Sequence, residues 1–190
     1  MEIQMLSANR TVCFALALLI CPAIGKADQP TMSNLQAQLY PVNADRLLPG
    51  PFVDAVRANR EYVLAHDADK LLAPFRREAG LSPRKESYGN WENIGLDGHT
   101  AGHYLSALAS LIATGQDTPE GELQRRLTYM VSELAECQKA GGDGYVGGVP
   151  GSKALWAEIG NGNVDAINRK WVPWYNIHKT YAGLRDAYLL

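Results

Sequence analysis

The sequence predicts an all-α fold built of helical hairpins, and two features of its 190 residues indicate this. Apolar side chains recur three or four positions apart over long stretches, as at Leu123, Leu127, Met130 and Leu134, which is the spacing of a helix buried along one face. Glycine- and proline-rich loops separate these stretches, the richest being 141–148, and no strong strand run occurs. We therefore expect a bundle or a toroid of helical hairpins, with sites at one mouth.

The first two helices are expected between residues 51 and 80. Pro51 suits a first helical turn, because the N–H that it lacks would have no partner there. Asp67 is expected to cap the second helix, which Gly80 ends. Before them, residues 28–50 are polar and proline-dotted, and we expect an extended lead-in with room for one short strand at 39–42. Residues 81–96 are expected to form a long loop.

The later helices are placed by their caps and stops. Asp97 is expected to cap a helix over 98–114 that Gly115 ends. Thr118 is expected to cap the following helix, with Pro119 in its first position. Residues 155–159 are long enough for one helical turn, and the last helix is expected to begin near Pro173.

Residues 1–27 have the layout of a cleavable export signal. Arg10 supplies a positive charge, residues 12–21 form an unbroken apolar run, and Gly25 and Ala27 place small residues before the expected cleavage site. The run is shorter than the about 20 apolar residues that cross a bilayer, which favours a cleaved signal over an uncleaved anchor. We expect a periplasmic or secreted protein with no membrane contact after cleavage.

The other end of the chain lacks a helix stop. Residues 174–190 follow helical spacing, with apolar side chains at Ile177, Tyr181, Leu184 and Tyr188, and neither a glycine nor a polar cap follows them. We therefore expect the chain to be the N-terminal part of a larger protein.

The charge balance argues against two classes of partner. The net charge is -2, and loss of Arg10, Lys26 and Glu2 with the signal changes it to -3. Such a weak negative balance argues against nucleic acid and against anionic membrane surfaces as partners. Cys137 is the one cysteine left after cleavage, so it has no internal disulfide partner, and its apolar helix face indicates an inert buried thiol.

His99 and His103 form the sharpest candidate site. They lie four residues apart, so on a helix they share one face. Four-apart histidines can bind zinc, but the metalloprotease pattern needs a Glu directly after the first His, and Thr100 stands there. Three interpretations stay open: a zinc pair, one histidine packed in the core with the other at a helix start, or a His99 that faces a cleft and hydrogen-bonds a polar ligand. In the last, Asp97 would serve as helix cap and as the partner of His99.

Trp174 and His178, near the start of the last predicted helix, form the second candidate. Flat apolar sugar faces stack on indole rings while polar groups take the hydroxyls, so this pairing suits a sugar. The alternative is that Trp171 and Trp174 only plug the mouth of a hairpin.

Loop carboxylates are the third candidates. Glycoside hydrolysis normally needs two carboxyl groups across the scissile bond. Five loop or cap acids are placed to reach a cleft: Glu92, Asp97, Asp143, Glu158 and Asp165. The sequence pairs no two of them.

An ordered series of motifs resembles one known family. The motifs include Leu47-Leu48-Pro49-Gly50-Pro51-Phe52, Asn59-Arg60-Glu61-Tyr62, Tyr88-Gly89-Asn90-Trp91-Glu92, Leu96-Asp97-Gly98-His99, Gly102-His103-Tyr104-Leu105-Ser106-Ala107, Asp143-Gly144-Tyr145 and Trp174-Tyr175-Asn176-Ile177-His178-Lys179. Together they resemble the β-L-arabinofuranosidase-type glycoside hydrolase family, from about Val42 to Leu190. The order of the motifs is far more specific than any one of them.

The resemblance implies that residues 51–190 form the N-terminal part of an (α/α)6-barrel catalytic domain. The implied activity of the whole enzyme is retaining hydrolysis of terminal β-L-arabinofuranosyl groups on plant-type glycans. In that family the nucleophile is a cysteine thiolate held by zinc together with further Cys ligands and a Glu, and another Glu is the acid/base; zinc keeps the thiolate deprotonated. The resemblance does not include Cys137 among these residues. We therefore expect the nucleophile and the acid/base beyond residue 190, no zinc held by this segment, and no activity in the isolated chain.

What carries over to this segment is the sugar-contacting side of the pocket. His178 is the best match to a substrate-binding histidine, followed by His99, Asp97 and His103, with Trp174 as an aromatic wall. The expected ligand is a carbohydrate with arabinofuranosyl groups. The alternative from another class is a helical carbohydrate-binding or scaffold module without chemistry.

Overall fold

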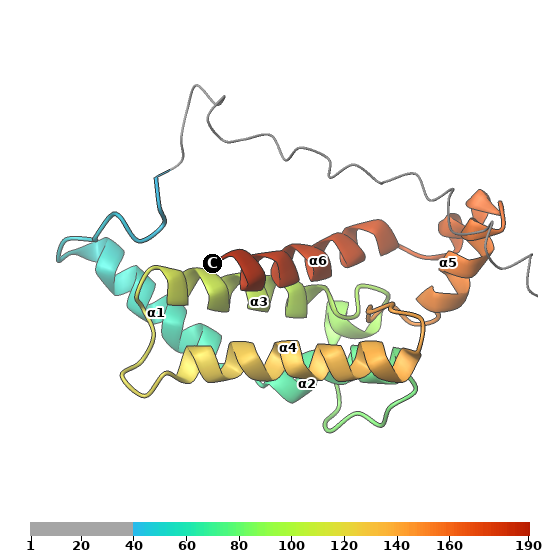
Figure 1. Cartoon of the computed structure of the whole chain (residues 1–190), viewed down its shortest axis with the longest axis horizontal. Helices are drawn as coiled ribbons and strands as arrows, with labels where there is room; N and C mark the ends of the chain where they lie inside the picture. The colour runs from blue at the N-terminus through green and yellow to red at the C-terminus, as the bar shows by residue number, and fades with distance from the viewer. Residues whose placement is uncertain (1–39) are drawn as a thin grey trace, which may run out of the picture. The chain divides into compact units, whose positions relative to one another are not determined.

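The structure, a computed structural model, describes residues 40–190 (Figure 1). The expected signal at 1–27 and the first part of the expected lead-in lie outside the described residues. Within them the chain is all-helical, as predicted, and has no strand. The elements are α1 (Pro51–Ala65), α2 (Ala68–Glu78), the 3-10 helix η2 (Asn90–Asn93), α3 (His99–Ala113), α4 (Glu122–Gly141), α5 (Ser152–Gly160), the 3-10 helix η3 (Val164–Arg169) and α6 (Pro173–Leu189). No helix in this part of the chain is long and apolar enough to cross a membrane.

Several predicted helix boundaries are confirmed. Pro51 and Pro173 open α1 and α6. The Asp67 carboxylate caps α2, because it accepts a hydrogen bond of 3.0 Å from the Asp69 N–H. α3 ends at Ala113, two residues before Gly115, whose left-handed φ of 72° turns the chain away from the helix. Residues 40–50 are irregular, so the strand allowed at 39–42 does not form in its described part.

The predicted start of the helix after Thr118 is wrong by about one turn. α4 begins at Glu122, after Gly121 in a left-handed conformation, and Pro119 lies in the preceding turn. The Thr118 hydroxyl accepts from the Glu122 N–H at 3.0 Å, and the Asp117 carboxylate accepts from the Leu123 N–H at 2.8 Å. These side chains cap the helix from a turn, which helix-start spacing alone does not reveal. The short turn expected at 155–159 is likewise longer, extending over Ser152–Gly160.

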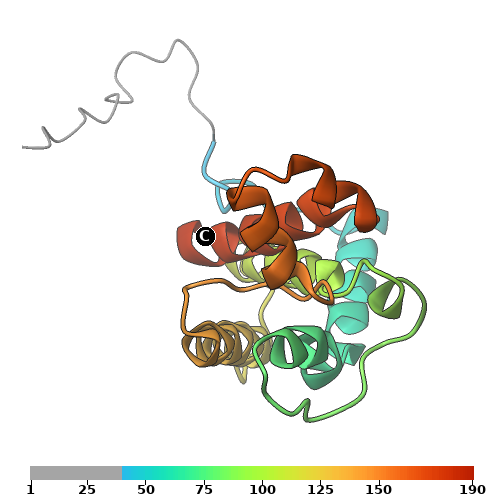
Figure 2. The same cartoon turned by 90° about the vertical axis from the view of Figure 1, so that its right-hand side faces the viewer.

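The long helices form two layers (Figures 1 and 2). α3 and α6 lie side by side and run in the same direction, whereas α2 and α4 form the second layer, and α4 runs opposite to α3. Apolar side chains fill the space between the layers and make the core; they include Leu71, Leu72, Phe75, Leu105, Leu108, Leu123, Met130 and Leu134. The layers place the N-terminal ends of α3 and α6 at the same end of the bundle.

Glycine lets α3 and α6 approach closely. A β-carbon on Gly102 would overlap the Lys179 carbonyl, and one on Gly183 would overlap the Gly102 carbonyl. Beyond this contact, the Ser106 hydroxyl of α3 donates to the Asp186 carboxylate of α6 at 2.6 Å. The close contact requires glycine at both positions, because backbone atoms of the facing helix occupy the space that a side chain would need.

We expect Gly102→Ala to destabilise the fold by about 1–3 kcal/mol, since the added methyl group forces α6 away from α3. Gly160→Ala is the matched control, because its added methyl group meets nothing within 4 Å. Urea unfolding followed by circular dichroism measures both variants. Equal midpoints for Gly102→Ala and the unsubstituted chain would contradict the close-packing account.

Candidate functional site

The candidate site lies at the N-terminal ends of α3 and α6. A cleft of about 810 Å³ opens beside the start of α3, lined by His66, Tyr88, the 89–94 segment, His99 and Thr100. Its volume falls within the range of about 300–1,000 Å³ that is usual for small-molecule sites. Trp91, 61% exposed, presents a flat apolar face at this cleft. The lining therefore combines aromatic faces with hydrogen-bonding groups.

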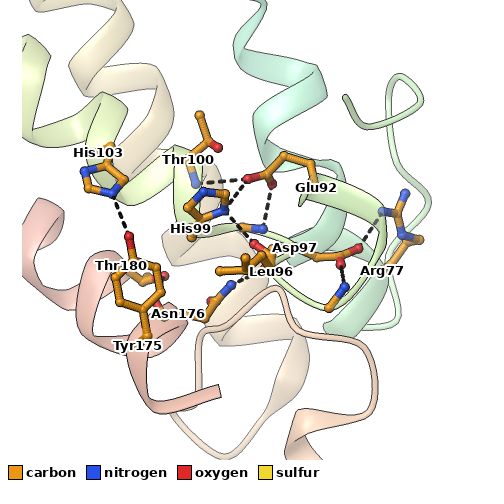
Figure 3. Close-up of polar contacts among 12 residues, drawn as sticks. Arg77, Glu92, Leu96, Asp97, His99, Thr100, His103, Tyr175, Asn176 and Thr180 are labelled. Carbon is orange, nitrogen blue, oxygen red and sulfur yellow. Dashed lines mark hydrogen bonds and ion pairs between the residues drawn. The ribbon is translucent and has the colours of Figure 1, made fainter. Parts of the chain in front are cut away.

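Glu92 caps α3, and this corrects the prediction that Asp97 does so. α3 begins after Gly98, which has a left-handed φ of 92° and offers no capping side chain. The buried Glu92 carboxylate instead accepts from the Gly98 N–H at 2.7 Å and from the Thr100 N–H at 3.0 Å (Figure 3). A negative charge there also suits the positive end of the helix dipole. Glu92 reaches these groups from η2, so no cap spacing in the sequence predicts it.

Asp97 has a different role from the one expected. It is 3% exposed, and its carboxylate accepts from the Gly95 N–H at 2.9 Å and lies 3.9 Å from the Arg77 guanidinium. Burial raises the pKa of Asp97 above its ordinary value. Its carbonyl accepts from the buried Asn176 side chain of α6 at 2.8 Å. Asp97 thus ties the turn that precedes α3 to the helix α6. It is not the partner of His99.

The structure brings His99 and His103 together with an aromatic side chain of α6. Their ring centroids lie 6.0 Å apart, and the His99 ring lies 6.3 Å from that of Tyr175. His103 Nε2 is 3.5 Å from the Tyr175 hydroxyl, the outer limit of a hydrogen bond (Figure 3). The ring centroids of Trp91 and His99 lie 6.2 Å apart. We call His99, His103, Tyr175 and Trp91 the histidine cluster.

The pKa of His103 lies below its ordinary value of 6.5. Partial burial is the first cause, because it disfavours the charged imidazolium, and the cation of Lys179 is the second. His99 and His178 lower this pKa further. The Lys179 ammonium lies 5.0 Å from the Tyr175 ring centroid, at the edge of the histidine cluster. His103 is therefore neutral at neutral pH and can donate or accept a hydrogen bond.

Two further sequence candidates, His178 and Trp174, lie on α6. His178 is exposed, follows Tyr175 by three residues in α6, and is one of the groups that lower the pKa of His103. Trp174 instead packs on Trp156 of α5, with ring centroids 4.6 Å apart, and no ring contact joins it to a histidine in the described part of the chain. Tyr175 and Trp91, which sequence reasoning did not single out as site residues, complete the cluster.

The residues present do not fit a zinc–thiolate centre. Among residues 40–190 there is no group of three or more His, Cys, Asp or Glu side chains that could hold a metal ion. Cys137 is buried within α4, and burial raises the pKa of its thiol to about 11. At neutral pH it is a protonated thiol, which is a poor nucleophile and a poor metal ligand.

Comparison with known proteins identifies one family. The family described as β-L-arabinofuranosidase, GH127 catalytic domain, matches residues 45–190, which include α1 to α6 and the whole histidine cluster. A search among curated proteins finds no match.

We expect Lys179→Met to raise the pKa of His103, because removal of a neighbouring cation favours the imidazolium. Titration of the His103 ring by NMR should give a midpoint below 6.5 in the unsubstituted chain and a higher one in the variant. Lys139→Met, on α4, is the control and should leave the midpoint unchanged.

The lowered pKa of His103 also makes the stability of the fold depend on pH. The folded-state pKa of His103 is below its unfolded value, so below about pH 6.5 the unfolded chain binds more protons than the folded chain. The free energy of unfolding therefore decreases as the pH falls below about 6.5. A His103 midpoint at or above 6.5 would contradict both expectations.

Proposed function

Because the chain belongs to the β-L-arabinofuranosidase GH127 catalytic-domain family, we propose that it supplies the sugar-binding side of an active site that releases terminal β-L-arabinofuranosyl groups from plant-type glycans. Members of this family are glycoside hydrolases, so the substrate is a carbohydrate. The observation that carries the proposal is the histidine cluster, in which side chains of α3, α6 and η2 meet. Two of its members, His99 and Trp91, line the cleft. The two-layer, all-helical arrangement supports a place in an (α/α)6 barrel.

The cluster has the chemistry that a neutral sugar needs. Neutral His103 and the Tyr175 hydroxyl can each donate and accept hydrogen bonds with sugar hydroxyls. The exposed ring of Trp91 offers an apolar face on which a furanose can stack. His178 extends the polar side of the site along α6. These side chains bind and orient the sugar, and their rigid helices limit its freedom before reaction.

The reaction itself needs groups that residues 40–190 do not offer. The family's zinc-held thiolate cannot be Cys137, whose buried thiol keeps its proton at neutral pH. Nor do these residues contain a group of side chains able to hold zinc. We propose that the nucleophile, the zinc ligands and the acid/base are encoded after residue 190, and we assign no catalytic step to this segment.

Binding tests the proposal directly. The chain should bind methyl β-L-arabinofuranoside in calorimetry, and His103→Ala should weaken that binding by about tenfold, the equivalent of one lost hydrogen bond. Ser110→Ala, near the far end of α3, is the matched control and should bind like the unsubstituted chain. Equal affinity of the His103→Ala variant would exclude the histidine cluster as the sugar site.

An activity assay distinguishes this segment from the whole enzyme. The purified 190-residue chain should release no p-nitrophenol from p-nitrophenyl β-L-arabinofuranoside. Release would contradict the placement of the catalytic groups outside the segment. Codons for a Glu and a Cys cluster in the gene after Leu190 would support the enzyme, whereas a stop codon there would favour a binding or scaffold module.

We also propose that the protein is exported, on the strength of the charged, apolar and small-residue layout of residues 1–27. An exported enzyme meets polysaccharide directly. The N-terminal sequence of the protein recovered from periplasm or medium should begin at Asp28. An intact Met1 end on protein confined to the cytoplasm would contradict export.

A further inference from the structure

The contact between Glu92 and His99 stands out because both side chains are buried. Glu92 is 4% exposed and His99 is 7% exposed. Glu92 Oε1 lies 2.7 Å from His99 Nδ1, and the two Glu92 oxygens also accept from the Gly98 and Thr100 N–H groups (Figure 3). The carboxylate is therefore held by the start of α3 and is aimed at one particular nitrogen of the ring.

The position of the ring proton follows from the acceptors around Nδ1. The Leu96 carbonyl oxygen lies 2.8 Å from Nδ1, and Glu92 Oε1 lies 2.7 Å from the same nitrogen. A carbonyl oxygen accepts hydrogen bonds and has no proton to donate. Nδ1 must therefore carry the proton, and in the neutral ring Nε2 carries the lone pair.

His99 Nε2 remains available to a ligand. Within residues 40–190, no buried side-chain nitrogen or oxygen lacks a hydrogen-bond partner. His99 Nε2 has no hydrogen-bond partner among these residues, since the ring's one hydrogen bond is made by Nδ1. Nε2 must therefore be accessible to solvent. His99 lines the cleft beside Trp91, so the atom presented there is a hydrogen-bond acceptor.

We propose that Glu92 is a positioning residue for sugar binding. It holds the His99 ring with its proton on Nδ1, so that Nε2 accepts a hydrogen bond from a hydroxyl group of the bound sugar. The ligand part of this inference rests on the proposed function, whereas the tautomer part does not. Glu92 thereby joins two tasks: it caps α3 and it sets the hydrogen-bonding sense of the first side chain in that helix.

The tautomer is measured on the unsubstituted full chain without sugar. Long-range ¹H–¹⁵N spectra of the histidine rings at mildly alkaline pH should show His99 protonated at Nδ1. A His99 ring protonated at Nε2 would overturn the proposal, whatever the sugar-binding result. This measurement needs no variant, so a substitution that unfolds α3 cannot obscure it.

Variants then test the part played by Glu92. In Glu92→Gln a single amide oxygen cannot serve every donor, so the Nδ1-protonated population should fall and the affinity for methyl β-L-arabinofuranoside should drop about fivefold to tenfold. Glu92→Asp keeps the carboxylate and should recover part of both effects. Glu86→Gln, an exposed acid of the same loop, is the matched control and should change neither.

The outcomes separate this inference from the proposed function. A Glu92→Gln chain that is folded by circular dichroism and has unchanged tautomer populations would overturn the role of Glu92, because the Leu96 carbonyl alone would then set the ring. Failure of the unsubstituted chain to bind the arabinofuranoside would overturn the proposed function and the ligand part together. Loss of affinity alongside loss of the Nδ1 proton supports the proposal.

Discussion

The site depends on the close contact of α3 with α6. Gly102 and Gly183 bring the two backbones together, and this sets the distance between every side chain of the first turns of both helices. His103 and Tyr175 meet only because the helices are this close. Asn176 then ties α6 to the Asp97 carbonyl ahead of α3, which fixes the register at the cleft end. Two packed helices thus hold His99, His103 and Tyr175, and Trp91 joins them from η2.

Buried charge at this end of the bundle is arranged so that the cleft itself stays neutral. The Glu92 carboxylate faces backbone N–H groups and the inner nitrogen of His99. Asp97 faces the Gly95 N–H and Arg77, away from His99. Burial and Lys179 keep His103 uncharged at neutral pH. What remains at the surface of the cleft is a set of dipoles and aromatic faces, which suits a neutral polyhydroxylated ligand better than an anion or a metal ion.

The sequence predicts the helical class and most helix ends, because proline, glycine and cap residues act within a few positions of the chain. It fails where a cap acts across a turn: Glu92 stands six residues before Gly98, and Asp117 reaches the start of α4 from a loop. Sequence spacing did identify His99 and His103 as one helix face. It could not join Tyr175 to them, since that contact spans 72 residues and depends on how α3 packs on α6.

The central claim is that an arabinofuranosyl group lies against α3 and α6 at the histidine cluster. Intermolecular nuclear Overhauser effects between methyl β-L-arabinofuranoside and the labelled chain test it most directly. We expect contacts from the sugar ring protons to the ring protons of His103, Tyr175 and Trp91. Contacts confined to Trp156 and Trp174, or to the face of α4, would contradict it.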